Sequence, residues 1–167
     1  MTRTDRRPVI VVGYDGSEPS RAALSLAARR AGRRGLVFVV HAYELPPDFL
    51  GSPNFDRLLS ERKDHGRAML DAIALTGNDE LLDTEYEAEL IGGPPAQAIA
   101  DVARVRDADE IVVGARGLGR VRALLGSVSH ELLHIADRPV LVIPAAAVES
   151  VERGRAGKRA AQRQHES

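Results

Sequence analysis

The feature that most limits the folds open to this sequence is a series of short apolar runs separated by longer mixed stretches. Four of the runs consist of apolar, mostly β-branched residues: Val9–Val12, Leu36–Val40, Ile111–Val113 and Val140–Ile143. Continuous apolar runs of this length are typical of strands buried on both faces of a parallel sheet. Parallel neighbours need a long crossover, and the intervening stretches are long enough to hold helices. The sequence therefore predicts an α/β protein.

The stretches between the runs carry helix signals. Ser17 is a predicted N-cap, with Pro19 in the first turn of a helix that ends at Gly35. A second helix is predicted over 55–74, although Gly66 weakens it locally, and its candidate core positions are Leu58, Leu59, Met69, Leu70 and Ile73. The other predicted helices are 96–106 and 127–136, and the predicted strands are 9–13, 36–42, 85–91, 109–114 and 139–143.

Strands that alternate with helices predict an open, doubly wound, five-stranded parallel sheet of order 3-2-1-4-5 with helices on both faces. The segment 85–91 alternates charged with apolar residues, which is typical of an edge strand with one wet face. In such a sheet the ligand lies beyond the carboxyl ends of the strands, at the switch point between the first and fourth strands. We therefore expect the loops that contain Asp15 and Gly114 to meet at one site.

The composition excludes several classes of function. A net charge of −1 gives no electrostatic reason to expect nucleic acid or an anionic membrane, and the absence of cysteine excludes disulfides and thiol chemistry. No apolar run approaches the ~20 residues of a membrane span, and the first residues do not form a signal peptide. We expect a soluble cytoplasmic protein with a flexible segment 1–7, one domain over 8–145 and a polar, disordered tail over 146–167.

Two glycine-rich segments, 114–119 and 126–129, follow the fourth strand and are typical of a phosphate-binding loop. Glycines let backbone N–H groups approach an anion, and a helix N-terminus adds unpaired donors and the positive end of a dipole. Ser127 is both a candidate N-cap and a candidate hydroxyl donor. Further candidate donors are the Ser129 hydroxyl and the guanidinium groups of Arg116 and Arg120.

Several of these residues have simpler explanations. Asp15 would not favour phosphate directly; it suits ribose hydroxyls or a hydrated Mg²⁺ ion, or it only forms a turn ahead of Ser17. The glycines at 114 and 126 could equally permit tight turns. His130 and His134 have the i, i+4 spacing that suits a metal, but no third ligand is evident, and we expect helix-surface or interface positions for both.

Six segments in a fixed order resemble the universal stress protein family. They span roughly residues 8–144 and are Val11–Ser17, Val40–Ala42, Gly92–Pro94, Val113–Gly117, Gly126–Ser129 and Arg138–Ile143. Several agreements in one order are far more specific than a single glycine motif.

The resemblance implies a flavodoxin-like sheet of the adenine nucleotide alpha hydrolase-like type. In one branch of the family it also implies ATP binding, with or without Mg²⁺, through a pattern that Gly114, Gly117 and Gly126–Ser127 match. The spacer between Gly117 and Gly126 has eight residues, Leu118–Leu125, which is one fewer than in that pattern. Asp15 resembles a ligand-supporting position of the first loop, and the segment 40–42 is similar to one that contacts adenine. The candidate nucleotide-binding residues are Gly13, Asp15, Val40, Ala42, Gly114, Ala115, Arg116, Gly117, Leu118, Gly119, Arg120, Gly126, Ser127, Val128 and Ser129.

The sequence favours nucleotide binding over efficient catalysis. It places no Walker lysine and no general base, so we expect at most slow ATP hydrolysis, and it lacks the Gly-x-Ser-x-Gly motif of serine hydrolases. We therefore expect a stress-response regulatory protein that binds an adenine nucleotide. The alternatives are a stress or scaffold protein of the same fold without nucleotide, a cyclic AMP-binding relative, and an electron-transfer flavoprotein.

The last predicted strand bears on partners. Val140–Ile143 lies at an edge of the predicted sheet, where bare backbone groups beside apolar side chains must be covered or paired. Family resemblance implies dimerisation across this strand, so we expect a homodimer. The alternative is that the segment 145–150 covers the edge.

Overall fold

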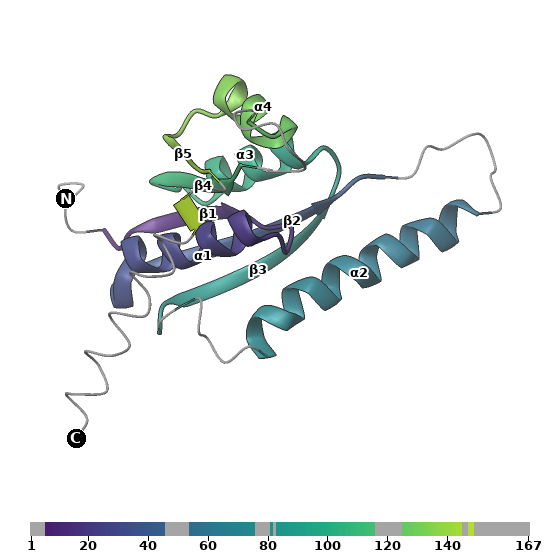
Figure 1. The fold of residues 1–167 in the computed structure, drawn as a ribbon, viewed down its shortest axis with the longest axis horizontal. Helices are drawn as coiled ribbons and strands as arrows, with labels where there is room; N and C mark the ends of the chain where they lie inside the picture. The colour runs from purple at the N-terminus through teal and green to yellow at the C-terminus, as the bar shows by residue number, and fades with distance from the viewer. Residues whose placement is uncertain are drawn as a thin grey trace.

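The computed structural model describes residues 6–45, 54–75, 81, 83–115, 125–144 and 147–148, and it alternates strands with helices along the chain (Figure 1). Its elements are β1 (Val9–Gly13), α1 (Glu18–Ala31), the 3-10 turn η2 (Gly32–Arg34), β2 (Leu36–Tyr43), α2 (Phe55–Leu75), β3 (Glu85–Gly92), α3 (Pro95–Val105), β4 (Glu110–Gly114), α4 (Ser127–Ile135) and β5 (Val140–Ile143). None of the helices in these ranges is long and apolar enough to cross a membrane.

The five strands form one parallel sheet with the order β3-β2-β1-β4-β5. This confirms the predicted fold class, and each strand differs from its predicted bounds by at most one residue. The register pairs Gly13 of β1 with Val40 of β2 and Val113 of β4. Because β2 continues to Tyr43, it extends beyond the end of its central neighbour.

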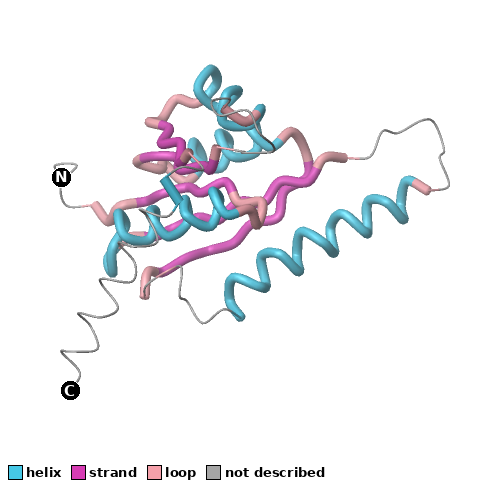
Figure 2. Tube along the Cα trace, in the orientation of Figure 1, coloured by secondary structure: helices cyan, strands magenta, loops and turns pink. Residues whose placement is uncertain are grey.

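Helices cover both faces of the sheet, and successive strand residues point to opposite layers. Ile10 and Val12 pack in a core with α1 and α2, whereas Val9 and Val11 pack in a second core with α3 and α4. In the view of Figure 2 the strands lie between α3 and α4 on one side and α2 on the other. Two apolar cores around a double-sided sheet explain why the central strands are continuous apolar runs.

The first helix begins as predicted and ends earlier. The Ser17 hydroxyl accepts a hydrogen bond from the Ser20 amide at 3.3 Å, which makes Ser17 the N-cap. The α-helical part stops at Ala31 because Gly32 adopts a φ of 64°, and the 3-10 turn continues the chain to Gly35. Glycine adopts this left-handed conformation at little steric cost.

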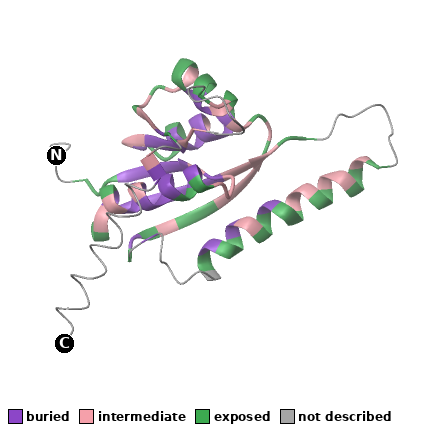
Figure 3. Ribbon diagram, in the orientation of Figure 1, coloured by how far each residue is buried: buried purple, intermediate pink, exposed green. Residues whose placement is uncertain are grey.

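The helix α2 continues through Gly66 without a break. Leu70 and Ile73 are buried, while the predicted core positions Leu58, Leu59 and Met69 are only half-buried, and exposed residues alternate with buried ones along the helix (Figure 3). Gly66 packs closely against the sheet. A Cβ at this position would lie 2.5 Å from the Leu90 Cδ1 atom and 2.9 Å from the His41 Cδ2 atom. The glycine that weakens the helix in isolation therefore allows the helix to dock.

The two edges of the sheet differ in chemistry. On β3 the glutamates of the α3 side form ion pairs, Glu85 with Arg7 at 2.9 Å and Glu89 with Arg106. The hydrogen bond that Arg106 donates to Glu89 raises the pKa of Arg106. The Arg106 guanidinium also lies 4.4 Å from the centre of the Phe38 ring. On β5 all four residues, Val140–Ile143, are aliphatic. Charged side chains protect β3 against edge pairing, and β5 has no such protection.

The chain turns back after β5. The Ala147 amide donates to the Pro144 carbonyl at 2.8 Å, and Val148 is buried in the core that α1 and α2 cover. The sequence analysis assigned Ala147 and Val148 to the disordered tail over 146–167. In the part of the chain that the structure describes, only β4 is hydrogen-bonded to β5.

Replacing Gly66 with alanine tests the docking of α2. Helix propensity alone would make Gly66→Ala stabilising by about 1 kcal/mol, but the added Cβ meets Leu90 and His41, so we expect a net loss of about 1–2 kcal/mol. Chemical denaturation measures the change. The exposed neighbour Ala68 supplies the control, since Ala68→Gly should cost about 1 kcal/mol through propensity alone. A stabilised Gly66→Ala variant would show that α2 is not packed this closely.

Candidate functional site

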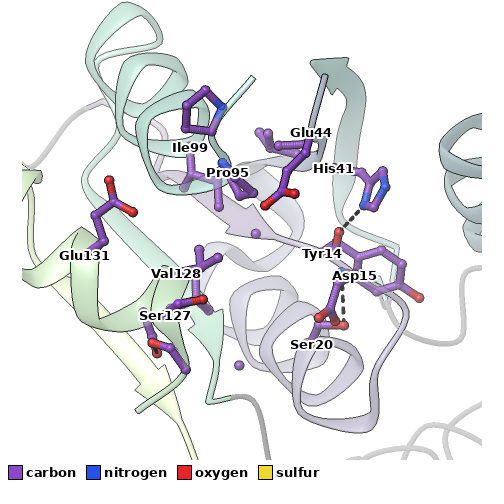
Figure 4. A pocket seen from close by; sticks show the side chains of 18 of the residues that line it. Tyr14, Asp15, Ser20, His41, Glu44, Pro95, Ile99, Ser127, Val128 and Glu131 are labelled. Atoms are coloured by element: carbon purple, nitrogen blue, oxygen red, sulfur yellow. Dashed lines mark hydrogen bonds between the residues drawn. The ribbon is translucent and has the colours of Figure 1, made fainter. Parts of the chain in front are cut away.

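A cleft of about 810 Å³ lies where the carboxyl ends of β1, β2 and β4 meet the first turns of α1, α3 and α4 (Figure 4). This is the rim that parallel topology predicts for a ligand. Nine of the candidate residues line it: Gly13, Asp15, Val40, Ala42, Gly114, Gly126, Ser127, Val128 and Ser129. The sequence analysis did not select the other lining residues as candidates: Tyr14, Ser17, Ser20, His41, Glu44, Leu45, Gly93, Pro94, Pro95, Ile99, Val113 and Glu131.

The first loop is held in shape by its own polar groups. Asp15 Oδ1 accepts from the Ser17 amide at 3.1 Å and from the Ser17 hydroxyl at 2.5 Å. Ser20 is buried, and its hydroxyl donates to the Ser17 carbonyl at 2.9 Å. Asp15 therefore forms the turn ahead of an N-cap, which was the simpler of its two explanations, and it does so at the wall of the cleft.

The start of α4 presents uncapped backbone donors. Gly126 occupies the N-cap position and makes no side-chain cap, so the expectation that Ser127 caps the helix is wrong. Ser127 is instead the first helical residue, and its side chain is exposed at the cleft. Ser129 is buried, and its hydroxyl donates to the Gly126 carbonyl at 3.0 Å. The hydroxyl that remains available for a ligand at this helix start is that of Ser127.

Three described helices direct their N-termini at the cleft. Each N-terminus carries unpaired N–H groups and a partial positive charge, which favours an anion. α3 begins at Pro95 after its N-cap Pro94, and neither residue has an N–H group. In α1, Pro19 has no N–H group and the Ser20 amide already donates to the Ser17 hydroxyl. The best anion-binding part of the cleft is therefore the uncapped first turn of α4.

The opposite part of the cleft is the open end of β2. The Tyr14 amide donates to the Val40 carbonyl at 2.9 Å, and the Gly93 amide donates to the Tyr43 carbonyl at 3.0 Å. Since backbone groups alternate in direction along a strand, Ala42 must direct its N–H and C=O to the β1 side. β1 has already ended there, and these groups have no hydrogen bond to other described residues. They form a donor–acceptor pair at the cleft wall that no described residue uses.

Comparison with known proteins agrees with this architecture. A family model described as the universal stress protein family matches residues 7–144. A protein of Thermus aquaticus named "universal stress protein in QAH/OAS sulfhydrylase 3'region" is 40% identical over 137 residues, which cover 80% of this chain and 96% of the relative. This chain belongs to the universal stress protein family.

Two solved structures of the universal stress protein family contain nucleotides according to their names. One is a universal stress protein in complex with cAMP, with a TM-score of 0.60, 30% identity, and coverage of 81% of this chain and 96% of its own. The other comes from Archaeoglobus fulgidus in complex with dAMP, with a TM-score of 0.53, 26% identity, and coverage of 83% and 98%. Members of this family thus bind adenine nucleotides.

The absence of a side chain at Gly114 allows β4 to pack closely against α1, and this packing role is more evident than a role in ligand binding. A Cβ on Gly114 would lie 2.6 Å from the Pro19 carbonyl carbon and 2.7 Å from the Ser20 nitrogen. The end of β4 is therefore pressed against the first turn of α1, which fixes two walls of the cleft relative to each other. Ala115 does not line the cleft, and its amide donates to the Ile143 carbonyl at 2.7 Å. That amide is not available to a phosphate.

The remaining candidates of the glycine-rich loop, Arg116, Gly117, Leu118, Gly119 and Arg120, lie outside the described residues. No cluster of three or more His, Cys, Asp or Glu side chains that could hold a metal occurs in the described ranges. His130 and His134 lie exposed on α4 with their rings edge to face, 4.8 Å between centroids.

Alanine at position 114 tests the close contact between β4 and α1. The added Cβ meets backbone atoms that no side-chain rotation can move, so we expect Gly114→Ala to lower the free energy of unfolding by about 2–3 kcal/mol. Denaturant unfolding without ligand measures it. Ala115→Gly in the adjacent position should cost only about 0.5–1 kcal/mol, the ordinary penalty for glycine. Equal costs at both positions would mean that the contact with Pro19 and Ser20 is not tight.

Proposed function

We propose that this protein binds an adenine nucleotide in the cleft and acts as a regulatory protein of the cytoplasmic stress response. The observation that carries the proposal is the N–H and C=O pair of Ala42 at one wall of the cleft, which has no hydrogen bond to another described residue, while the uncapped start of α4 forms another wall. One wall suits a base and the other suits phosphate. The complexes of relatives with cAMP and dAMP support the same class of ligand.

The Ala42 pair distinguishes adenine from guanine. Adenine presents the N1 acceptor beside the N6 donor, so a peptide N–H and C=O can pair with both. Guanine presents a donor at N1 and an acceptor at O6, which places donor against donor and acceptor against acceptor. Unpaired buried polar groups are costly, so this arrangement selects adenine.

The phosphate part of the proposal rests on α4 and the loop before it. The uncapped amides of Ser127, Val128 and Ser129 and the Ser127 hydroxyl are the proposed donors. Gly117, Arg116 and Arg120 complete the proposed phosphate loop on the strength of the sequence pattern alone. We propose ATP, with Mg²⁺ held by its phosphates near Asp15, as the ligand.

Regulation is a better proposal than turnover. The described lining residues include no lysine or arginine and no histidine on the phosphate side. Phosphoryl transfer depends on positioned cations and an oriented nucleophile, so we propose at most slow ATP hydrolysis. The alternative function, a scaffold protein that binds no nucleotide, is favoured by the self-contained hydrogen bonding of Asp15 and Ser17.

Calorimetry with AMP and GMP tests the base contact, because the two ligands share their sugar and phosphate. We expect AMP to bind at least about tenfold more tightly than GMP. Competition between ATP and cAMP then identifies the preferred adenine nucleotide. No binding heat with AMP, ATP or cAMP, and no co-purified nucleotide, would support the scaffold alternative.

The same titration tests the start of α4. Ser127→Ala should weaken ATP binding by about three- to tenfold, since it removes one hydrogen bond to a charged ligand. Ser60→Ala, on the exposed surface of α2, is the matched control and should leave the affinity unchanged. Equal affinities of both variants would remove Ser127 from the proposed site.

We also propose that the protein forms a homodimer through β5. The Pro139 and Ile143 carbonyls accept from β4, so the backbone groups of Val140 and Val142 point away from the sheet. An outward row of unpaired groups on an aliphatic strand is a template for a second copy. The segment at 147–148 packs with Val148 into the core beneath the sheet, and no described residue pairs with this edge.

Proline at position 142 tests the dimer. Val142→Pro removes an outward N–H without touching the bonds to β4, so it should convert a dimer into a monomer in sedimentation or light scattering. Val142→Ala keeps the N–H and should remain dimeric. A dimeric Val142→Pro variant, or a monomeric wild type, would overturn pairing through β5.

A further inference from the structure

His41 lies at the point where β1 leaves the sheet and β2 continues alone. Its backbone lies between Val40 and Ala42, and its side chain points to the face that α2 covers. His41 lines the main cleft and also a second cavity of about 370 Å³ between β2 and α2. From the sequence, His41 was expected to be structural or to lie near the adenine pocket, within the segment 40–42.

The His41 ring is bonded to the backbone of the first loop. Its Nδ1 atom lies 2.8 Å from the Tyr14 carbonyl oxygen (Figure 4). A carbonyl oxygen can only accept, so Nδ1 carries the proton and donates. The Tyr14 amide meanwhile donates to the Val40 carbonyl at 2.9 Å. Both backbone groups of Tyr14 are therefore held by β2.

The Tyr14 carbonyl is the acceptor that the next rung of the β1–β2 ladder would use. In a parallel ladder a residue that donates to position 40 accepts from position 42, so the regular partner of the Tyr14 carbonyl is the Ala42 amide. His41 Nδ1–H donates to this carbonyl, and the Ala42 amide makes no hydrogen bond to it. The ladder stops one hydrogen bond early, and the Ala42 amide is left facing the cleft.

The helix α2 holds the ring in this position from behind. A Cβ on Gly66 would lie 2.9 Å from His41 Cδ2 and 3.4 Å from Nε2, so the helix backbone is packed against the ring. One turn earlier, Arg62 donates to the Glu44 carbonyl just beyond the end of β2. The ring is thus fixed between α2 and the Tyr14 carbonyl.

We propose that His41 is a positioning residue that keeps the base-recognition edge of β2 open. By donating to the Tyr14 carbonyl, it prevents the Ala42 amide from closing the ladder and leaves the Ala42 N–H and C=O for an adenine base. The role in ligand binding rests on the proposed function. The effect on the Ala42 amide exists without any ligand and is tested separately.

Amide hydrogen exchange followed by NMR in the ligand-free protein tests the structural step. In wild type the Ala42 amide should exchange rapidly, while the neighbouring ladder amide of Val40 is protected. His41→Leu removes the side-chain donor, and the Ala42 amide should then pair with Tyr14 and become at least about tenfold slower. Asn places its amide nitrogen near the position of Nδ1, so His41→Asn should restore rapid exchange.

Calorimetry with AMP and GMP on the same variants tests the consequence for recognition. His41→Leu should weaken AMP binding by about three- to tenfold and reduce its preference over GMP, and His41→Asn should restore both. His65→Leu, the same substitution at an exposed position of α2, is the control and should behave like wild type in both measurements.

The outcomes separate the two proposals. If wild type binds no adenine nucleotide but His41→Leu protects the Ala42 amide, the proposed function fails and the ladder-stopping role stands. If the Ala42 amide is already protected in wild type, or if His41→Leu leaves its exchange unchanged while the variant stays folded, the inference about His41 is overturned. An AMP loss in His41→Leu that His41→Asn does not restore would also overturn it, because it would show a purely steric role.

Discussion

The cleft depends on one constraint, which is that the central strand ends before its neighbour. β1 stops at Gly13 while β2 continues to Tyr43. Beyond that point the sheet has an internal edge, with the backbone of Ala42 on one side and the end of β4 on the other. Because the strands are parallel, the helices α1, α3 and α4 all start at the same rim. Within one cavity, the end of β2 supplies an N–H donor next to a C=O acceptor, and the helix N-termini supply positive electrostatic potential.

Local sequence signals predicted the architecture because each depends on neighbouring residues. The β-branched runs predicted the strand bounds to within one residue. Ser17 predicted the start of α1, because its hydroxyl accepts from the amide of Ser20, only three residues further along the chain. The charged alternation of β3 gave its edge position. The same reasoning predicted the rim on which nine of the candidate residues lie, since the switch point follows from strand order.

Contacts between distant segments could not be predicted in this way. Gly66 weakened a predicted helix, yet its missing side chain admits Leu90 and His41 of the sheet. Gly114 was assigned to a phosphate loop, and its closest neighbours are Pro19 and Ser20 of α1. The N-cap of α4 is Gly126 and not the predicted Ser127, because Ser127 is already the first residue of the helix. To predict the roles of these glycines, one must know which backbone segments pack together in the fold, and the type of a single residue does not show this.

The difference between the two sheet edges has a consequence for the size of any assembly. β3 carries glutamates held by Arg7 and Arg106, and β5 is purely aliphatic. Two copies joined through β5 about a two-fold axis would form one continuous sheet whose outer edges are both β3 strands. The charged side chains along those edges disfavour pairing with a third copy. In the proposed dimer, growth by strand addition would therefore end at the closed pair and would not continue into a fibre.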